Sequence, residues 1–381
     1  MNVRHISSPC CAIVLALCLS GCSLFGHRAP KYKWGFVDKN GKLVIAQTFS
    51  AVNGFHAYAE PDINDDPVQN FHEGLAAVAV GELWGYIDKT GKMVIPAQFT
   101  EAGNFSEGLA CVARDGKFGF IDKTGQTAID FDPYQNRRLG VTQSEFHDGL
   151  APFQEKAGDK FGYCDKSGKF VIPPIYLDAR PFADGLALVE KRFDDHYIWC
   201  VIDAAGKEIF FKTNLKYAGE GKFIESLSAD EHYYCDSNGK RFSGALQLAN
   251  SFSDGLAVAV NAGEFKWIHN IVNRNAYTVA TATLEGAGDF REGLCPAAIT
   301  NSRMSPVKLW GFIDRQGQWR IPATYINCQP FYDGIAAVTT KGKLSGYINH
   351  KGEMVIAPKY NRAHNFSEGL AAVGTQQGLI D

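Results

Sequence analysis

The stretch Trp84-Gly85-Tyr86-Ile87-Asp88-Lys89-Thr90-Gly91-Lys92-Met93-Val94-Ile95-Pro96 decides the fold, because the chain repeats it. It recurs with small changes at residues 34–45 and again at 310–317. Each copy is followed by a second phrase, of which Phe105-Ser106-Glu107-Gly108-Leu109-Ala110 is one example. Self-similarity at a period of about 20 to 50 residues indicates a repeat architecture.

The position of the tryptophan marks the start of each copy. Copies are assigned at Trp34, Trp84, Phe118, Phe161, Trp199, His232, Trp267, Trp310 and Ser345. They are about 32 to 50 residues long, and a partial tenth copy ends the chain at Gly378-Leu379-Ile380-Asp381. The copies at His232 and Trp267 are the most degraded. The sequence therefore predicts about nine units.

Each unit has the composition of β-structure. Aromatic and β-branched residues alternate in the repeated phrase, as strands require. The Leu-Ala-Ala-Val strand of the second phrase is apolar on both faces, which is typical of a strand covered on both sides. The spacing predicts three strands per unit and a fourth, shorter one. The glycine of the Trp-Gly pair leaves room on one face for a neighbouring ring or backbone.

The turn between the first two strands of the phrase carries Asp88 and Gly91. The aspartate can accept backbone N–H bonds across the turn, and the glycine can adopt a positive φ. Acidic residues recur at this turn and at the turn of the second phrase. Identical acids in identical turns indicate turn capping, since catalysis needs carboxylates in distinct environments. The two series are Asp38, Asp88, Asp122, Asp165, Asp203, Asp236 and Asp314, and Glu73, Glu107, Asp148, Asp184, Asp254, Glu292, Asp333 and Glu368.

These two phrases in fixed order resemble the WG-repeat family, which is named for its Trp-Gly pair. The resemblance covers residues 32–381. It implies an all-β repeat domain in a bacterial protein and brings no catalytic residues.

Two architectures fit such units. A β-propeller uses about four strands per blade at a similar period, and we expect this arrangement. An open β-solenoid, with atypical end units acting as caps, is the alternative. Nine units are many for one ring, but terminal half-units are what a ring needs to join its first and last blades.

The N-terminus has the pattern of an export signal. Arg4 and His5 precede a short apolar run at residues 11–19, which is too short to span a bilayer and typical of a signal peptide. The run ends in Leu19-Ser20-Gly21-Cys22, which resembles the bacterial lipobox. The resemblance implies a signal peptide at 1–21, a lipidated Cys22 and a tether at 22–31. By the same resemblance, Ser23 indicates the outer membrane. The alternative is an ordinary signal peptide with a chance cysteine.

Composition excludes several classes of protein. The net charge is −3, and no basic patch suited to nucleic acid is present. No sequence motif for a metal, cofactor or catalytic site occurs, so we expect none of these. An exported protein with six further cysteines invites disulfides. Their places in the repeat instead favour free, buried thiols. These cysteines are Cys111, Cys164, Cys200, Cys235, Cys295 and Cys328.

Two insertions break the period, at residues 56–70 and 132–145. Insertions in repeat proteins map to loops, which often lie on the binding face. The first is acidic but lacks the central glycine and distal glutamate of a calcium loop. As candidate binding residues we name Asp62, Asp65, Asp66, Tyr134, Arg137 and Arg138.

The sequence thus favours a lipid-anchored binding or scaffolding module in the bacterial envelope, on the periplasmic side or at the cell surface. Its expected partners are the membrane, through the anchor, and an envelope protein or glycan. One alternative is a glycan-acting enzyme with a site in a central channel or on a concave face. Another is a purely structural envelope protein.

Overall fold

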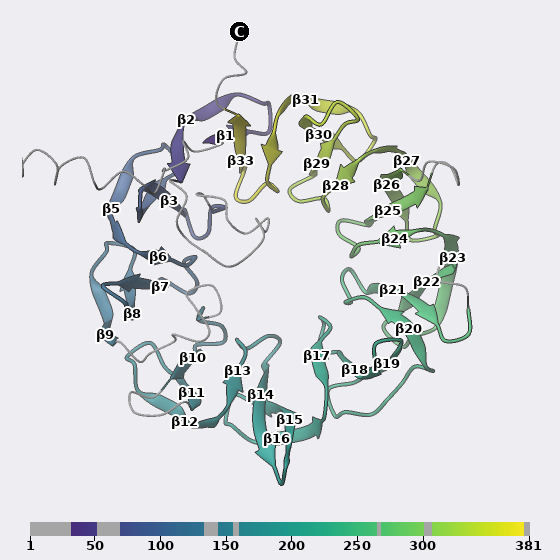
Figure 1. Ribbon diagram of the computed structural model, residues 1–381, viewed down its shortest axis with the longest axis horizontal. Coiled ribbons are helices and arrows are strands. Elements are labelled where there is room, and N and C mark those ends of the chain that lie inside the picture. Colours follow the sequence, from purple (N-terminus) through teal and green to yellow (C-terminus); the bar gives the residue numbers. More distant parts are fainter. Residues whose placement is uncertain are drawn as a thin grey trace, which may run out of the picture.

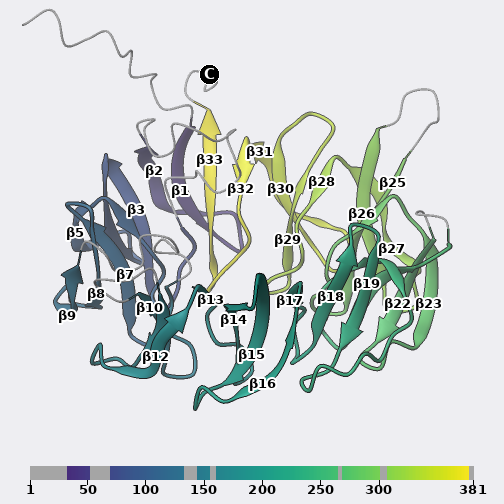
Figure 2. The ribbon, with the colours of Figure 1, turned by 60° about the horizontal axis from the view of Figure 1, so that its bottom comes forward.

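The computed structural model describes residues 32–51, 69–132, 144–154, 160–264, 268–300 and 307–376. The regular elements in these ranges are the strands β1 to β33. They form small sheets arranged in a ring around a central opening (Figure 1). In the tilted view the ring is a short cylinder, with the sheets standing side by side in its wall (Figure 2). The fold is therefore all-β and propeller-like, as the sequence predicts.

The strands divide into nine blades, because each of the two seven-stranded sheets contains two blades and each of the five smaller sheets is one blade. Blade 1 contains β32 (Arg362–Ala363), β33 (Leu370–Gln376), β1 (Tyr32–Asp38) and β2 (Leu43–Ala51). Blade 2 contains β3 (Leu75–Gly81), β4 (Leu83–Asp88) and β5 (Met93–Phe99). Blade 3 contains β6 (Glu101–Ala102), β7 (Leu109–Arg114), β8 (Lys117–Asp122) and β9 (Thr127–Asp132). Blade 4 contains β10 (Ala151–Gln154), β11 (Phe161–Cys164) and β12 (Phe170–Tyr176).

Blade 5 contains β13 (Asp178–Ala179), β14 (Leu186–Phe193), β15 (His196–Asp203) and β16 (Glu208–Lys212). Blade 6 contains β17 (Leu215–Tyr217), β18 (Phe223–Ser228), β19 (Glu231–Cys235) and β20 (Leu246–Ala249). Blade 7 contains β21 (Leu256–Asn261), β22 (Ile268–Asn273) and β23 (Thr278–Thr283), with β20 also pairing to β21. Blade 8 contains β24 (Gly286–Ala287), β25 (Leu294–Thr300), β26 (Lys308–Asp314) and β27 (Trp319–Tyr325). Blade 9 contains β28 (Asn327–Cys328), β29 (Ile335–Thr339), β30 (Ser345–Asn349) and β31 (Met354–Tyr360).

The blades are offset from the sequence repeat. The marker phrase, which starts each copy in the sequence, forms the third strand of a blade and not the first. In blade 3 the strands follow the order β6-β7-β8-β9, all antiparallel, and the short first strand lies nearest the central opening (Figure 1). The second strand carries the Leu-Ala phrase and is buried over five consecutive residues, 109–113. The third strand carries the marker phrase. The expected fourth strand is therefore present in six of the nine blades as described, and the fully apolar strand is covered on both faces.

This offset closes the ring. Because the described chain starts with a third strand and ends with a second strand, its two ends complete the same blade. β1 pairs with β33 antiparallel over seven residue pairs, from Tyr32↔Gln376 to Asp38↔Leu370. The open solenoid is therefore wrong. The partial copy Gly378–Asp381 lies outside the described residues and is not needed for the closure.

The apolar core lies between the blades. Each of nine buried clusters joins two consecutive blades, and one of them packs blade 9 against blade 1. Between blades 2 and 3, the Tyr86 and Phe105 rings meet edge to face with centroids 4.9 Å apart. The Tyr86 hydroxyl also donates a hydrogen bond to the Gly103 carbonyl, at 2.7 Å. Truncating such a buried ring costs about 3–5 kcal/mol, so stability depends on contacts between blades.

The glycine of the Trp-Gly pair makes room for backbone. A Cβ on Gly85 would lie 2.6 Å from the Ile95 carbonyl oxygen and 2.7 Å from the Ala97 nitrogen. The pairing of β4 with β5 shifts register at this point, so the outer strand bulges toward the glycine. Cys200 holds the same position in blade 5. There β15 and β16 stay in register through Val201, and the shift comes after it.

The turn of the marker phrase has the predicted geometry. Oδ1 of Asp88 accepts hydrogen bonds from the Thr90 and Lys92 backbone N–H groups, at 2.9 and 3.1 Å. Gly91 has φ +84°. In blade 7 this turn starts at Asn273, whose Oδ1 accepts hydrogen bonds from the backbone N–H groups of residues 275 and 277. One assignment of the sequence analysis is therefore wrong. The tryptophan slot of that copy is His269, and not Trp267.

We expect Gly91→Val to destabilise the protein by roughly 1–3 kcal/mol, because a β-branched residue is strained at positive φ. The new Cβ would also lie 3.0 Å from Cγ2 of Ile45 in blade 1. Lys92→Glu, at an exposed neighbouring position, should change stability by about 0.5 kcal/mol or less. Thermal unfolding of both variants checks this. Equal melting temperatures would contradict the turn assignment.

The acids of the second phrase link neighbouring blades. Each carboxylate accepts a hydrogen bond from the backbone N–H of the glycine in the same turn of the next blade, at 2.8–3.2 Å. The pairs are Glu368–Gly74, Glu73–Gly108, Glu107–Gly149, Asp148–Gly185, Asp184–Gly221, Glu220–Gly255, Asp254–Gly293, Glu292–Gly334 and Asp333–Gly369. We call these nine bonds the carboxylate latches. They form an unbroken circle.

The latches correct the interpretation of this second acidic series. Its members cap the next blade's turn and not their own, and Glu220 is a ninth member that the sequence analysis did not include. Several latch carboxylates also form an ion pair with a cationic side chain, as in Lys123–Glu73 at 3.0 Å and Lys166–Glu107 at 3.1 Å. Burial raises the pKa of Glu107, but hydrogen bonds from Gly149 and Lys166 outweigh it and leave the pKa below its usual value.

A depressed carboxyl pKa stabilises the fold above the unfolded pKa, and this stabilisation is lost as the pH falls through the folded value. We therefore expect Glu107→Gln to lower the free energy of unfolding at pH 7 by roughly 1 kcal/mol or less, because only the charge-assisted part of the bond is lost. At pH 3 wild type and variant should be nearly equal. Urea unfolding at both pH values measures the free energy of unfolding of each protein. If wild type and variant differed by the same amount at pH 3 and at pH 7, this would be evidence against a charged latch.

Candidate functional site

The predicted binding residues fall outside the described ranges. Cys22 does so, as do Asp62, Asp65, Asp66, Tyr134, Arg137 and Arg138, and they stay predictions. Within the described ranges, no helix is long and apolar enough to cross a membrane. No group of three or more potential metal ligands is found in that part of the chain.

All six mature cysteines of the prediction are free and buried. Burial raises the pKa of Cys200 and of Cys235 to about 11, so both thiols are protonated at neutral pH. A thiol in this state is a poor nucleophile. These side chains act as small apolar residues in the clusters between blades.

A site arises where the repeat is broken. At seven of the nine boundaries, an aromatic residue of the third strand contacts a phenylalanine of the next blade. Between blades 5 and 6 both partners are missing, because Val201 and Ala218 hold the two positions. Phe223 in turn stands where other blades carry alanine, or cysteine in one case, and it fills only part of the boundary.

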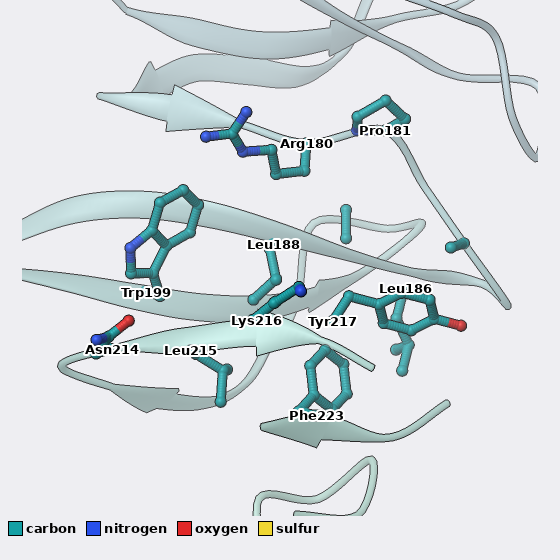
Figure 3. Close-up of a pocket in the computed structure, with 12 residues that line it drawn as sticks. Arg180, Pro181, Leu186, Leu188, Trp199, Asn214, Leu215, Lys216, Tyr217 and Phe223 are labelled. Carbon is teal, nitrogen blue, oxygen red and sulfur yellow. The ribbon is translucent and has the colours of Figure 1, made fainter. Parts of the chain in front are cut away.

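The boundary between blades 5 and 6 contains a pocket of about 490 Å³ (Figure 3). Its apolar lining comes from four strands, with Leu186, Leu188, Trp199, Leu215, Tyr217 and Phe223 as the larger side chains. Phe223 is almost fully buried and meets the Tyr217 ring edge to face, with centroids 5.5 Å apart. Ligand pockets are commonly of this size and largely apolar. We refer to it as the blade 5–6 pocket.

Two cationic side chains stand at the edge of the blade 5–6 pocket. The Arg180 guanidinium lies over the Trp199 ring, 5.5 Å from its centroid, and forms an ion pair with Asp178 at 3.0 Å. Lys216 on β17 is exposed and also lines the pocket (Figure 3). The pocket therefore combines an apolar interior with a positively charged edge.

The Tyr217 hydroxyl is fixed at the same site. It donates a hydrogen bond to the Asp184 carboxylate, which also accepts from the Gly221 N–H. Burial and this hydrogen bond raise the pKa of Tyr217 to about 12, so the phenol is protonated at neutral pH. The arrangement can hold an apolar group beside an anion.

The sequence analysis missed this pocket, although its cause is visible in the sequence. The phenylalanine two residues before the latch acid is present in eight blades and is Ala218 in the ninth. The leucine two residues after that acid, or isoleucine in blade 9, is Lys222 there. Glu220 lies in a degraded copy of the second phrase, so the two changes around it do not stand out in the sequence.

Comparison with known proteins agrees with the repeat structure. The family model described as "WG containing repeat" matches residues 34–57, 84–118, 161–192, 310–343 and 346–375. These five segments of the chain resemble the WG-containing repeat. The matched segments do not include Val201, Ala218 or Phe223, so the blade 5–6 pocket lies at the end of a matched segment: its lining from blade 5 up to Leu188 is matched, and its lining from Trp199 to Phe223 is not. No curated protein matches the sequence.

Several solved structures are similar to this one. A crystal structure of a eukaryotic initiation factor is 13% identical, with a TM-score of 0.57, and the match covers 92% of this chain and 99% of that one. BamB from Moraxella catarrhalis is 10% identical over 81% of this chain and 95% of its own, with a TM-score of 0.36. The designed protein Ika8 is 12% identical over 74% of this chain and 95% of its own, with a TM-score of 0.42. At such identities the first likeness concerns the fold alone.

Proposed function

We propose that this WG-repeat protein is a lipid-anchored binding module of the bacterial envelope, without catalytic activity of its own. The anchor is Cys22, and Ser23 after it favours the outer membrane. Two or three acyl chains on one residue give stable anchoring, whereas a single chain is marginal. The tether at 22–31 would hold the ring close to the bilayer, where it would bind another envelope component.

One observation supports binding over a purely structural role. The residues that recur in every blade are used to build and close the ring, as the carboxylate latches show. A ring that served only as a spacer would need nothing more. The blade 5–6 pocket departs from this pattern: it replaces a buried aromatic contact by an open cavity with a charged edge. Such a cavity lowers packing quality, so its presence suits a binding role.

We expect Cys22→Ala to release the protein from the membrane fraction without unfolding it, because the variant lacks the residue that would carry the acyl chains. Fractionation of cells in detergent-free buffer measures the release, and the melting temperature of the purified variant tests the fold. Sedimentation of the variant with membranes would contradict the lipid anchor.

Partner binding is tested with the lipid-free mature protein, beginning at Ser23. Immobilised protein should retain a defined component of solubilised envelopes, and free protein should compete for it. A glycan array run beside it tells a glycan partner from a protein partner. The proposed function would be contradicted if the immobilised protein retained no more envelope material than blank resin did and bound no glycan on the array.

The insertion at 56–70 is the second place to look for partner contacts. Deleting residues 60–68 should leave a folded, anchored protein, since loop length has only a small entropic effect on stability. Partner retention should fall if the insertion carries contacts. Misfolding of the shortened protein would show that the segment is structural.

A further inference from the structure

We infer that the blade 5–6 pocket binds an aromatic side chain presented by an acidic peptide segment of the partner. This inference rests on the proposed binding function and names the chemistry of the partner. The observations that carry it are the missing aromatic pair, the apolar lining and the two cations at the edge.

An aromatic ring suits the pocket because the corresponding position at most other blade boundaries is filled by a phenylalanine ring. Between blades 4 and 5, the Phe182 ring meets the Tyr163 ring with centroids 4.8 Å apart. Between blades 5 and 6, Val201 and Ala218 supply no ring, and Ala218 packs instead in the cluster between blades 6 and 7. A ring from a partner would contact Trp199, Tyr217 and the leucines that line the cavity. Edge-to-face ring contacts add about 0.5–1.5 kcal/mol to the burial of apolar area.

The lining favours a peptide side chain over a sugar. Most of the interior surface comes from leucine side chains and the Phe223 ring, which offer no hydrogen-bond partners, and the Asn214 amide is one polar group in the lining. The Tyr217 hydroxyl is already engaged by Asp184. Burying sugar hydroxyls against such a surface costs free energy, because they lose water without gaining new hydrogen bonds.

The edge favours acidic neighbours of the ring. Lys216 is exposed and forms no ion pair with any described residue. Burial raises the pKa of Asp289, and the charge of Lys216 opposes that shift. Arg180 forms an ion pair with Asp178. The Asp184 carboxylate is held by the Tyr217 hydroxyl and the Gly221 N–H. A carboxylate beside the inserted ring and next to Lys216 would therefore meet a positive charge, which aids both binding and orientation.

The direct test uses a fluorescein-labelled peptide, acetyl-Asp-Glu-Phe-Glu-Asp-amide, and the lipid-free mature protein, with binding followed by anisotropy. Replacing the peptide's phenylalanine by alanine should weaken binding at least about tenfold, as for a buried aromatic anchor. Replacing its acids by amides should weaken binding by several-fold and flatten the salt dependence. No binding of the acidic phenylalanine peptide, or equal binding of its alanine version, would overturn the inference.

Two variants place the binding in the pocket. Ala183→Tyr fills the cavity at a position where Tyr332 and Arg291 stand in blades 9 and 8, so the fold should tolerate it. Its matched control is Ser253→Tyr, the same repeat position in blade 7. Lys216→Glu reverses the charge at the edge, with Lys341→Glu on exposed blade 9 surface as control. Both pocket variants should weaken binding of the acidic peptide about tenfold or more, and both controls should leave its affinity unchanged.

The outcomes separate this inference from the proposed function. If Ala183→Tyr and Lys216→Glu still retain the envelope partner and the peptide as wild type does, the pocket inference is wrong and the binding function stands. If a fluorescein-labelled uronic-acid oligosaccharide binds to wild type but not to Ala183→Tyr, and the peptide does not bind, the site is a glycan site and the inference is also wrong. If the peptide binds as predicted but no envelope component is retained, the proposed function fails instead. Should Ala183→Tyr unfold, Lys216→Glu decides alone, because its side chain is exposed.

Discussion

Each blade of this ring has two apolar faces, and neither can be buried without a neighbour. The second strand of blade 3 is buried along 109–113 because blades 2 and 4 cover it. A linear stack of such blades would leave one apolar face exposed at each end. The pairing of β1 with β33 removes both ends at once, and the cluster between blades 9 and 1 completes the core. The other regular features of the molecule follow from this requirement.

The repeated polar residues serve the same requirement from the surface. The carboxylate latches run from blade to blade around the whole circle, and each places an acceptor on a backbone N–H that its own blade cannot satisfy. A repeated acid in this chain is therefore evidence of packing. Function is better sought where the repeat fails, and the boundary between blades 5 and 6 is the clearest failure in the described structure. There the loss of an aromatic contact leaves a cavity with a basic edge.

Much of this fold could be predicted from the sequence. The turn at Asp88 and Gly91, the strand on either side of it and the number of blades all follow from local residue patterns that recur. The closure followed less directly, because it depends on which strand begins a blade, and the marker phrase falls on the third strand. Two errors came from degraded copies: Trp267 was placed in a slot that His269 holds, and Glu220 was left out of its series.

The pocket could not be predicted, because a cavity depends on two positions in different blades that only the ring brings together. Val201 and Ala218 are each ordinary in a strand or loop, and their effect appears only when the Tyr163–Phe182 contact shows what they replace. Conversely, the residues first singled out for binding lie in insertions outside the described ranges. Breaks in a repeat therefore indicate candidate sites in two ways, through insertions and through substitutions at core positions.

Closure of the ring is tested most directly by a cross-link between the first and last strands. Lys33 on β1 pairs with Thr375 on β33. In the lipid-free mature protein carrying Lys33→Cys and Thr375→Cys, we predict that mild oxidation forms an intramolecular disulfide. The linked peptides should be identified by mass spectrometry, and the melting temperature should rise. The buried native thiols, with their raised pKa values, should not compete. If both introduced thiols stay fully accessible to maleimide after oxidation of the folded protein, the two ends do not meet and the ring is not closed.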